Sequence, residues 1–119
     1  MSAPNIVAVT NIIGNTGVQA VTNSATAIVT NSGASGKVYK INCLIVSNVD
    51  ASNSATLTVD LYRSSTAYTI INAVTVAINT SFTPIDKTLS LYLLEGDTLR
   101  LTANANSRLQ AVCSWEEIN

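Results

Sequence analysis

The acidic residues of the chain that could do chemistry together are Glu95 and Asp97, which flank Gly96, with Asp86 upstream. Two carboxylates this close could hold a calcium ion or work as an acid–base pair. A turn explains the same residues more simply, because glycine takes the positive φ that many turns require and an alternating segment follows. We therefore predict a turn here and no metal site.

A second acidic loop, Asp50-Ala51-Ser52-Asn53-Ser54, resembles the start of an EF-hand calcium loop. The EF-hand needs glycine at its sixth position and glutamate at its twelfth, but Ala55 and Leu61 stand there. The loop also lacks flanking helical patterns, so it too is predicted to be an ordinary turn.

Nucleophilic catalysis finds little support. The chain has no histidine, which excludes Ser-His-Asp and Cys-His catalysis, histidine-ligated zinc and an imidazole pH switch. Ser35 and Lys37 are the residue types of a Ser-Lys pair, but such catalysis needs a desolvated lysine and these residues lie in a glycine-rich turn, where solvated loop residues are expected. The sequence predicts no enzyme, no catalytic residue and no cofactor.

Cys43 and Cys113 are too far apart in sequence for a CxxC metal or redox site. Both fall in apolar patterns, so we expect small buried hydrophobic residues; a disulfide between adjacent strands stays open. The aromatic residues could stack on sugars, but they are only 5% of the chain and scattered, which favours core and interface packing. They include Tyr39, Tyr62, Tyr68, Tyr92 and Trp115.

Apolar and polar residues alternate along much of the chain with a period of two residues, which is typical of β-strands. These predicted strands must position the residues described above. The segments 55–62, 98–104 and 109–117 each carry one apolar face. In 38–48 both faces turn apolar in the second half, which predicts a strand covered on both sides there. Further strands are expected at 6–13, 17–22, 25–31, 67–78 (bent or split), 81–86 and 89–94.

Short turns rich in Gly, Asn, Asp and Ser connect these segments. Eight or nine strands at this spacing predict an all-β fold: a single antiparallel β-sandwich spanning residues 1–119, of jelly-roll or immunoglobulin-like type. The choice between the two stays open, although the Cys…Trp…Cys order of true immunoglobulin domains is absent.

The composition of the chain limits the classes of partner that it is expected to bind. Charged residues are 11% of the chain and the formal net charge is -1, so no electrostatic footprint for nucleic acid is expected. The longest apolar runs are far shorter than the about 20 residues of a membrane-spanning helix. The first residues lack a signal-peptide pattern. We expect no membrane partner, and synthesis in a cytoplasm that keeps both cysteines reduced.

Every charged residue lies at or after Lys37, so residues 1–36 carry no charge. Exposed sheet edges are normally protected by charges or proline. One explanation is that the strands of this segment are central in the sandwich. The other is that residues 1–13 form an interface strand or arm that neighbouring subunits cover. Both remain open; deleting residues 1–13 should change the assembly state only under the second explanation.

Four stretches of the sequence resemble small structural proteins of tailed marine and cyanobacterial bacteriophages: 1–16, 36–50, 91–106 and 113–117. The resemblance implies a virion component and brings no functional residues with it.

Within a virion we expect a capsid decoration (cement) protein, a homo-oligomer and by preference a trimer, that binds the major capsid protein and stabilises the outer lattice by many weak contacts. The expected contact residues are Ile6, Val7, Val9, Ile12 and Ile13. The alternative is a module at a tail, fibre or baseplate tip that binds a receptor or glycan.

Overall fold

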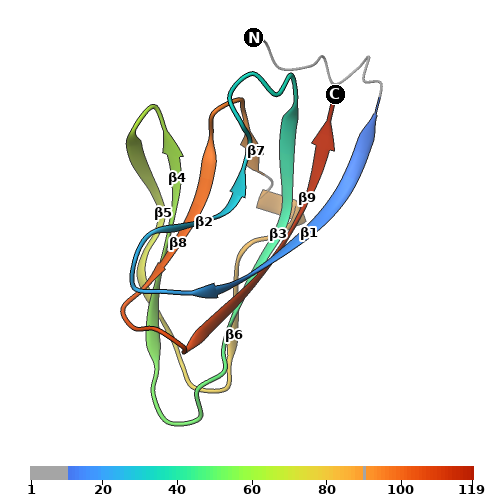
Figure 1. The fold of residues 1–119 in the computed structure, drawn as a ribbon. Coiled ribbons are helices and arrows are strands. Elements are labelled where there is room, and N and C mark those ends of the chain that lie inside the picture. Colours follow the sequence, from blue (N-terminus) through green and yellow to red (C-terminus); the bar gives the residue numbers. More distant parts are fainter. Residues whose placement is uncertain (1–10, 90) are drawn as a thin grey trace.

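The computed structural model describes residues 11–89 and 91–119, which form two antiparallel β-sheets packed face to face (Figure 1). The strands are β1 (Ile12–Val21), β2 (Thr26–Thr30), β3 (Val38–Asn48), β4 (Ala55–Arg63), β5 (Thr66–Val76), β6 (Ser81–Ile85), β7 (Leu91–Leu93), β8 (Thr98–Ala103) and β9 (Leu109–Ile118), with one 3₁₀ turn, η2 (Lys87–Leu89). The predicted all-β sandwich is confirmed.

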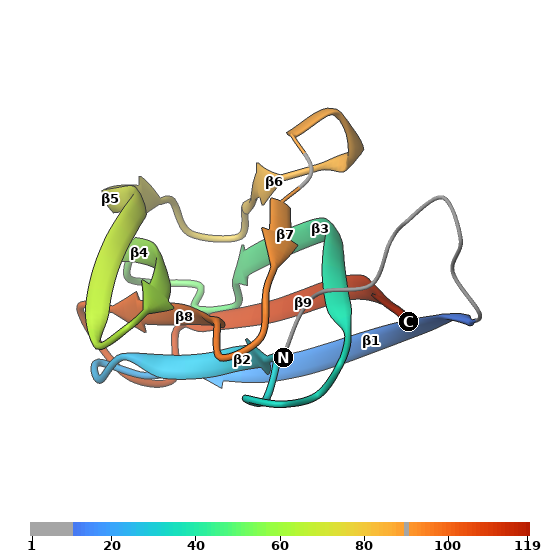
Figure 2. The same ribbon diagram turned by 90° about the horizontal axis from the view of Figure 1, so that it is seen from above.

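Sheet A has the strand order β1-β9-β3-β6, and β7 pairs with another part of β3. Sheet B has the order β2-β8-β4-β5. Figure 2 looks along the sandwich and shows the two sheets side by side, with β1 and β2 at one side and β5 and β6 at the other. In the part of the chain that is described, no helix is long and apolar enough to cross a membrane.

The core lies between the sheets, where the predicted apolar faces meet. Leu57, Leu99 and Leu101 of sheet B have no exposed surface, and Ala111 and Cys113 of sheet A are also buried. Alternation explains this arrangement, because successive side chains of a strand point to opposite faces. The polar residues between them, mostly threonines, face outward from sheet B.

The predicted break between strands 6–13 and 17–22 is wrong for the described residues. A single strand, β1, runs through Gly14 and Gly17, and all ten of its residues pair with β9 without a shift in register. One of these two glycines is needed for packing. A Cβ on Gly17 would lie 3.0 Å from the Trp115 ring, whereas one on Gly14 would meet nothing within 4 Å.

The alternation of β3 is interrupted by a bulge, which the sequence pattern did not reveal. The register with β9 shifts between Ile41 and Cys43, so the strand changes faces there. Ile41, Leu44 and Val46 point into the core and are fully buried, whereas Ile45 faces outward. The expectation that both sides of this half-strand are covered is therefore wrong for the single chain.

Candidate assembly surface on sheet A

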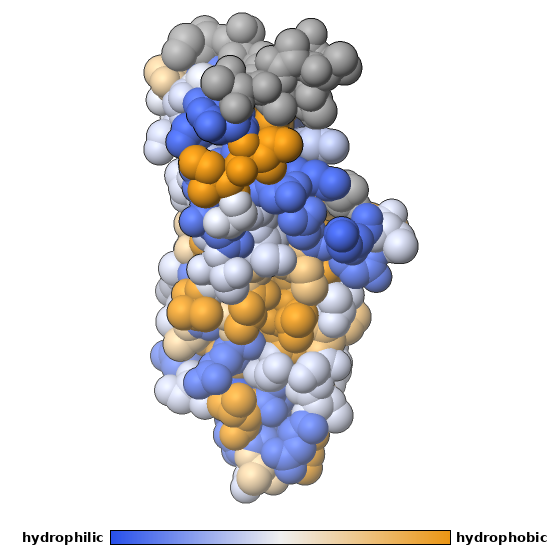
Figure 3. Space-filling model, turned by 90° about the vertical axis from the view of Figure 1, so that its right-hand side faces the viewer, coloured by the Kyte–Doolittle hydropathy of each residue, from blue (hydrophilic) through white to orange (hydrophobic). Residues whose placement is uncertain are grey.

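The outer face of sheet A carries a row of exposed aliphatic side chains. Val18 of β1 is opposite Val112 of β9, and Val112 is opposite Ile45 of β3. Residues opposite each other in antiparallel strands share a face and lie close together, so the three side chains form one row across three strands. Their exposed fractions are 77%, 43% and 38%. We call these three residues the apolar band; Figure 3 shows hydrophobic residues across the middle of this face.

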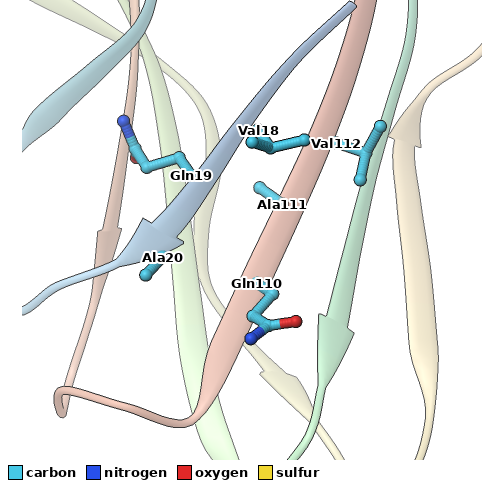
Figure 4. Close-up of a pocket in the computed structure, with 6 residues that line it drawn as sticks. All are labelled: Val18, Gln19, Ala20, Gln110, Ala111 and Val112. Carbon is cyan, nitrogen blue, oxygen red and sulfur yellow. The ribbon is translucent and has the colours of Figure 1, made fainter.

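A groove of about 320 Å³ lies at the β1 end of the apolar band. It is lined by Val18, Gln19, Ala20, Gln110, Ala111 and Val112. In Figure 4, Val18 and Val112 lie next to each other, while Gln19 points away on the other side of β1. The Gln19 side chain donates to the backbone oxygen of Ala27 at 2.6 Å, so its amide serves to join the two sheets. The groove therefore presents mainly aliphatic surface.

The centre of this face has no charged side chain among the described residues. Lys40 and Glu116 are opposite each other nearer the end of the sheet where β1 begins. The outer face of sheet B differs: Arg100 donates to Asp60 at 2.8 Å and lies 4.0 Å from the centre of the Tyr62 ring. Asp60 is only 5% exposed, and its negative charge is paired with the Arg100 guanidinium. Sheet B exposes apolar side chains on its edge strand β5, where Tyr68, Ile70 and Val74 are 57%, 38% and 36% exposed, whereas the apolar band of sheet A crosses the middle of its sheet.

The strand β1 is fixed to sheet A by a cluster around Glu117. Its carboxylate accepts from the Asn15 side chain at 2.8 Å and pairs with Lys37 at 3.2 Å. The Trp115 ring nitrogen donates to the same group at 3.4 Å. Burial, followed by the nearby negative charge of Glu117, raises the pKa of Tyr39 beside this cluster. Glu117 of β9 therefore joins Asn15 of β1 to Lys37, which immediately precedes β3.

The expected contact residues are only partly described. Ile6, Val7 and Val9 lie outside the described residues. Ile12 and Ile13 begin β1 and are 57% and 53% exposed, but they point to opposite faces of the sheet.

The sequence reasoning missed the apolar band itself. The sequence signal that could have located the band is the apolar character of both faces of 38–48. When a single chain covers one face of such a strand, the other apolar face remains available to a partner.

The acidic segment at Gly96 forms the predicted turn, with a φ of +87° at Gly96. Asp97 in this turn is 1% exposed and accepts two hydrogen bonds from Arg63. Burial alone would raise the pKa of Asp97; the hydrogen bonds from Arg63 and from the Leu94 N–H outweigh it, so the pKa lies below its ordinary value. Among the described residues, no three His, Cys, Asp or Glu side chains gather as a metal site.

Both cysteines are free. Cys43 is opposite Ser114 on the outer face of sheet A, whereas the neighbouring Cys113 points into the core. Because they lie on opposite faces, they do not form the disulfide that the sequence left open. Burial, with a smaller contribution from Cys43, raises the pKa of the Cys113 thiol to about 12. Cys113 is the small hydrophobic residue that was expected, and Cys43 is half-exposed beside the apolar band.

The aromatic residues do not gather into a sugar-binding platform. Trp115 packs against the core and Tyr62 lies under Arg100. Tyr68 and Tyr92 are exposed, at 57% and 40%, on different sheets.

No protein-family model matches the chain, and no curated protein matches it. A solved structure does: the one described as "Bacillus endospore appendages form a novel family of disulfide-linked pili". The match has a TM-score of 0.51 and 15% sequence identity, and it covers 89% of this chain and 86% of that one. At this identity the likeness concerns the fold. The chain shares a β-sandwich with a structural protein of a pilus.

Proposed function

We propose that the protein is a structural subunit of a repeating protein assembly and that it packs into this assembly through the outer face of sheet A. The observation that carries the proposal is the apolar band, Val18, Val112 and Ile45, on a face whose centre lacks charge. Large exposed apolar patches on soluble proteins mark interaction sites. Burial of this band against a partner would release the water that now covers it.

The mechanism of such a subunit is additive. Each copy contributes a modest apolar contact, and repetition over a lattice or fibre turns weak contacts into a stable assembly. The fold supports this role, because pairing of β1, β9 and β3 holds the three side chains of the band in one row. The likeness to a pilus protein is consistent with it, as a likeness of fold.

The finer form of the proposal is a capsid decoration protein of a bacteriophage virion, which binds the major capsid protein, by preference as a trimer. Its support is the sequence resemblance at 1–16, 36–50 and 91–106. A pilus-like appendage is the second candidate, favoured by the fold neighbour.

A module at a tail, fibre or baseplate tip is the third candidate. The exposed Tyr68, close to the β4–β5 hairpin at one end of the sandwich, would favour it.

The test uses one charge on each sheet. Val112→Lys places a lysine in the centre of the apolar band, and Thr56→Lys places one on the outer face of sheet B. We expect Val112→Lys to lower self-assembly and binding to empty capsids by about tenfold or more, since a buried charge costs more than about 1.4 kcal/mol, and Thr56→Lys to leave both unchanged. Equal effects of the two variants would overturn the proposal.

A further inference from the structure

Among residues 11–89 and 91–119, β9 is the one strand that pairs with β1, on one of its two sides. Asn11 and Asn119 exchange two backbone hydrogen bonds, of 2.9 and 3.0 Å. In an antiparallel pair, hydrogen-bonded and non-hydrogen-bonded positions alternate. The regular register of β1 therefore directs the N–H and C=O groups of odd-numbered residues toward β9. Those of the even-numbered residues point to the free edge: Ile12, Gly14, Thr16, Val18 and Ala20.

The other edges of the sandwich carry devices that hinder pairing with a further strand. β5 shifts register twice against β4 and holds Ala73 at a φ of +51°. β6 has five residues and contains Pro84, and β2 has five residues and a register shift. In residues 11–89 and 91–119, β1 alone is an edge strand that is long, regular and without charge or proline.

We propose that the free edge of β1 pairs antiparallel with β1 of a second copy of this chain, about a two-fold axis through Thr16. This inference rests on the proposed function, because it names the partner that one edge of the assembling sheet takes. The two copies of sheet A become one continuous sheet, in which β1 and its symmetry mate are the central pair.

The register follows from the faces and the backbone groups. An axis through a residue keeps outer faces together, whereas an axis between two residues would place the outer face of one copy beside the inner face of the other. With the axis at Thr16, the five free residues pair among themselves. Each donates and accepts one hydrogen bond, which makes about ten bonds. An axis at Asn15 or Gly17 leaves one of the five without a partner in β1.

The side chains of β1 fit this register. On the outer face, Val18 lies opposite Gly14 of the second copy, and Ile12 lies opposite Ala20, so a large side chain meets a small one in each case. Opposite pairs of this kind are the unit of sheet stabilisation. The absence of charge on β1 also removes the repulsion that an isologous contact would otherwise create, because such a contact places each residue type near its own copy. A second copy therefore satisfies this edge better than a strand of unrelated sequence would.

The test is a disulfide across the axis. In a Cys43→Ser background, Thr16→Cys places two cysteines opposite each other with a Cα separation of about 5.5 Å, inside the range for a disulfide. Val18→Cys is the matched control, because the two Val18 positions lie about 13 Å apart along the strands. Both sites are exposed on the outer face, so both variants should fold, which a thermal melt checks.

Under mild oxidation we expect Thr16→Cys to give at least about tenfold more covalent dimer than Val18→Cys. Self-association of the parent protein with no dimer from Thr16→Cys would overturn this register and leave the proposed function standing. A parent protein that stays at 12.5 kDa yet binds capsids would overturn the self-pairing alone. A parent protein that neither self-associates nor binds would overturn both.

Discussion

The ion pair of Arg63 with Asp97 provides a sharp test of how the ends of the sandwich are held. Asp97 is 1% exposed, and its carboxylate accepts from Arg63 and from the Leu94 N–H at 2.8 Å. Its backbone C=O accepts from Asn31, so the residue connects the β2–β3 and β7–β8 loops to the β4–β5 hairpin. Arg63→Met removes the guanidinium and keeps most of the aliphatic stem.

The cost can be worked from these contacts. A hydrogen bond to a charged group contributes about 1.5–3 kcal/mol, and Arg63 makes two such bonds to one carboxylate. The Arg63 side chain is 42% exposed, so solvent screening reduces the contribution. The substitution nevertheless leaves Asp97 buried with one remaining donor to its carboxylate. We expect the free energy of unfolding to fall by about 2–3 kcal/mol at neutral pH.

The pH dependence has a definite sign. The pKa of Asp97 is lower in the folded than in the unfolded protein. Its contribution is therefore complete above the ordinary pKa of about 3.9 and is lost as the pH falls through the folded-state value. The difference between wild type and Arg63→Met should shrink in strong acid, where Asp97 is protonated.

Urea unfolding followed by Trp115 fluorescence at pH 7 and in strong acid measures both quantities. Arg108→Met is the control, because Arg108 pairs with Asp50 at 3.8 Å in a loop, and it should cost much less. A cost for Arg63→Met below about 0.5 kcal/mol at pH 7, or one that stays constant into strong acid, would refute the reasoning.

Three further predictions concern the turn, the packing and the thiols. Ser64 and Ser65 form the two-residue β4–β5 turn with φ of 51° and 61°, so Ser64→Asn with Ser65→Gly should raise the unfolding free energy by about 1 kcal/mol in urea titrations; no gain would argue against strain there. Gly17→Ala should lower the melting temperature, because the new Cβ would lie 3.0 Å from the Trp115 ring, whereas Gly14→Ala should not; equal shifts would contradict this packing. In the native protein at pH 8, iodoacetamide should alkylate Cys43 long before Cys113, whose pKa is raised to about 12, and peptide mass spectrometry would show comparable labelling if this assignment were wrong.

The sequence was sufficient to predict the sandwich and most of its inner faces. In 55–62 and 98–104 the alternation is regular, and Leu57, Leu99 and Leu101 are buried as expected. The alternation pattern could not reveal the bulge in β3. One extra residue there reverses which of the later side chains point into the core, and no distinctive residue type marks its position. The same limit applied to β1, where separate strands were predicted at 6–13 and 17–22 and the structure has one continuous strand over Ile12–Val21.

The proposed assembly surface differs from the one that the sequence suggested. The absence of charge in residues 1–36 led to residues 1–13 as an interface strand or arm, which excludes Val18, and Val112 and Ile45 come from segments far along the chain. Only the sheet order brings them beside Val18, and sheet order is a tertiary property. The ion pairs of Asp97 and Glu117 were not predicted for a related reason: their partners, Arg63 and Lys37, are distant in sequence.

The central claim, that the outer face of sheet A is buried in an assembly, can be tested most directly with Cys43. This half-exposed thiol lies on that face beside the apolar band and is present in the natural chain. The measurement is the rate at which a maleimide alkylates Cys43 in assembled wild-type protein and in the dispersed Val112→Lys variant. Assembly should slow the reaction by about tenfold or more, because the partner excludes the reagent. Equal rates in a wild-type protein shown to be assembled would contradict it.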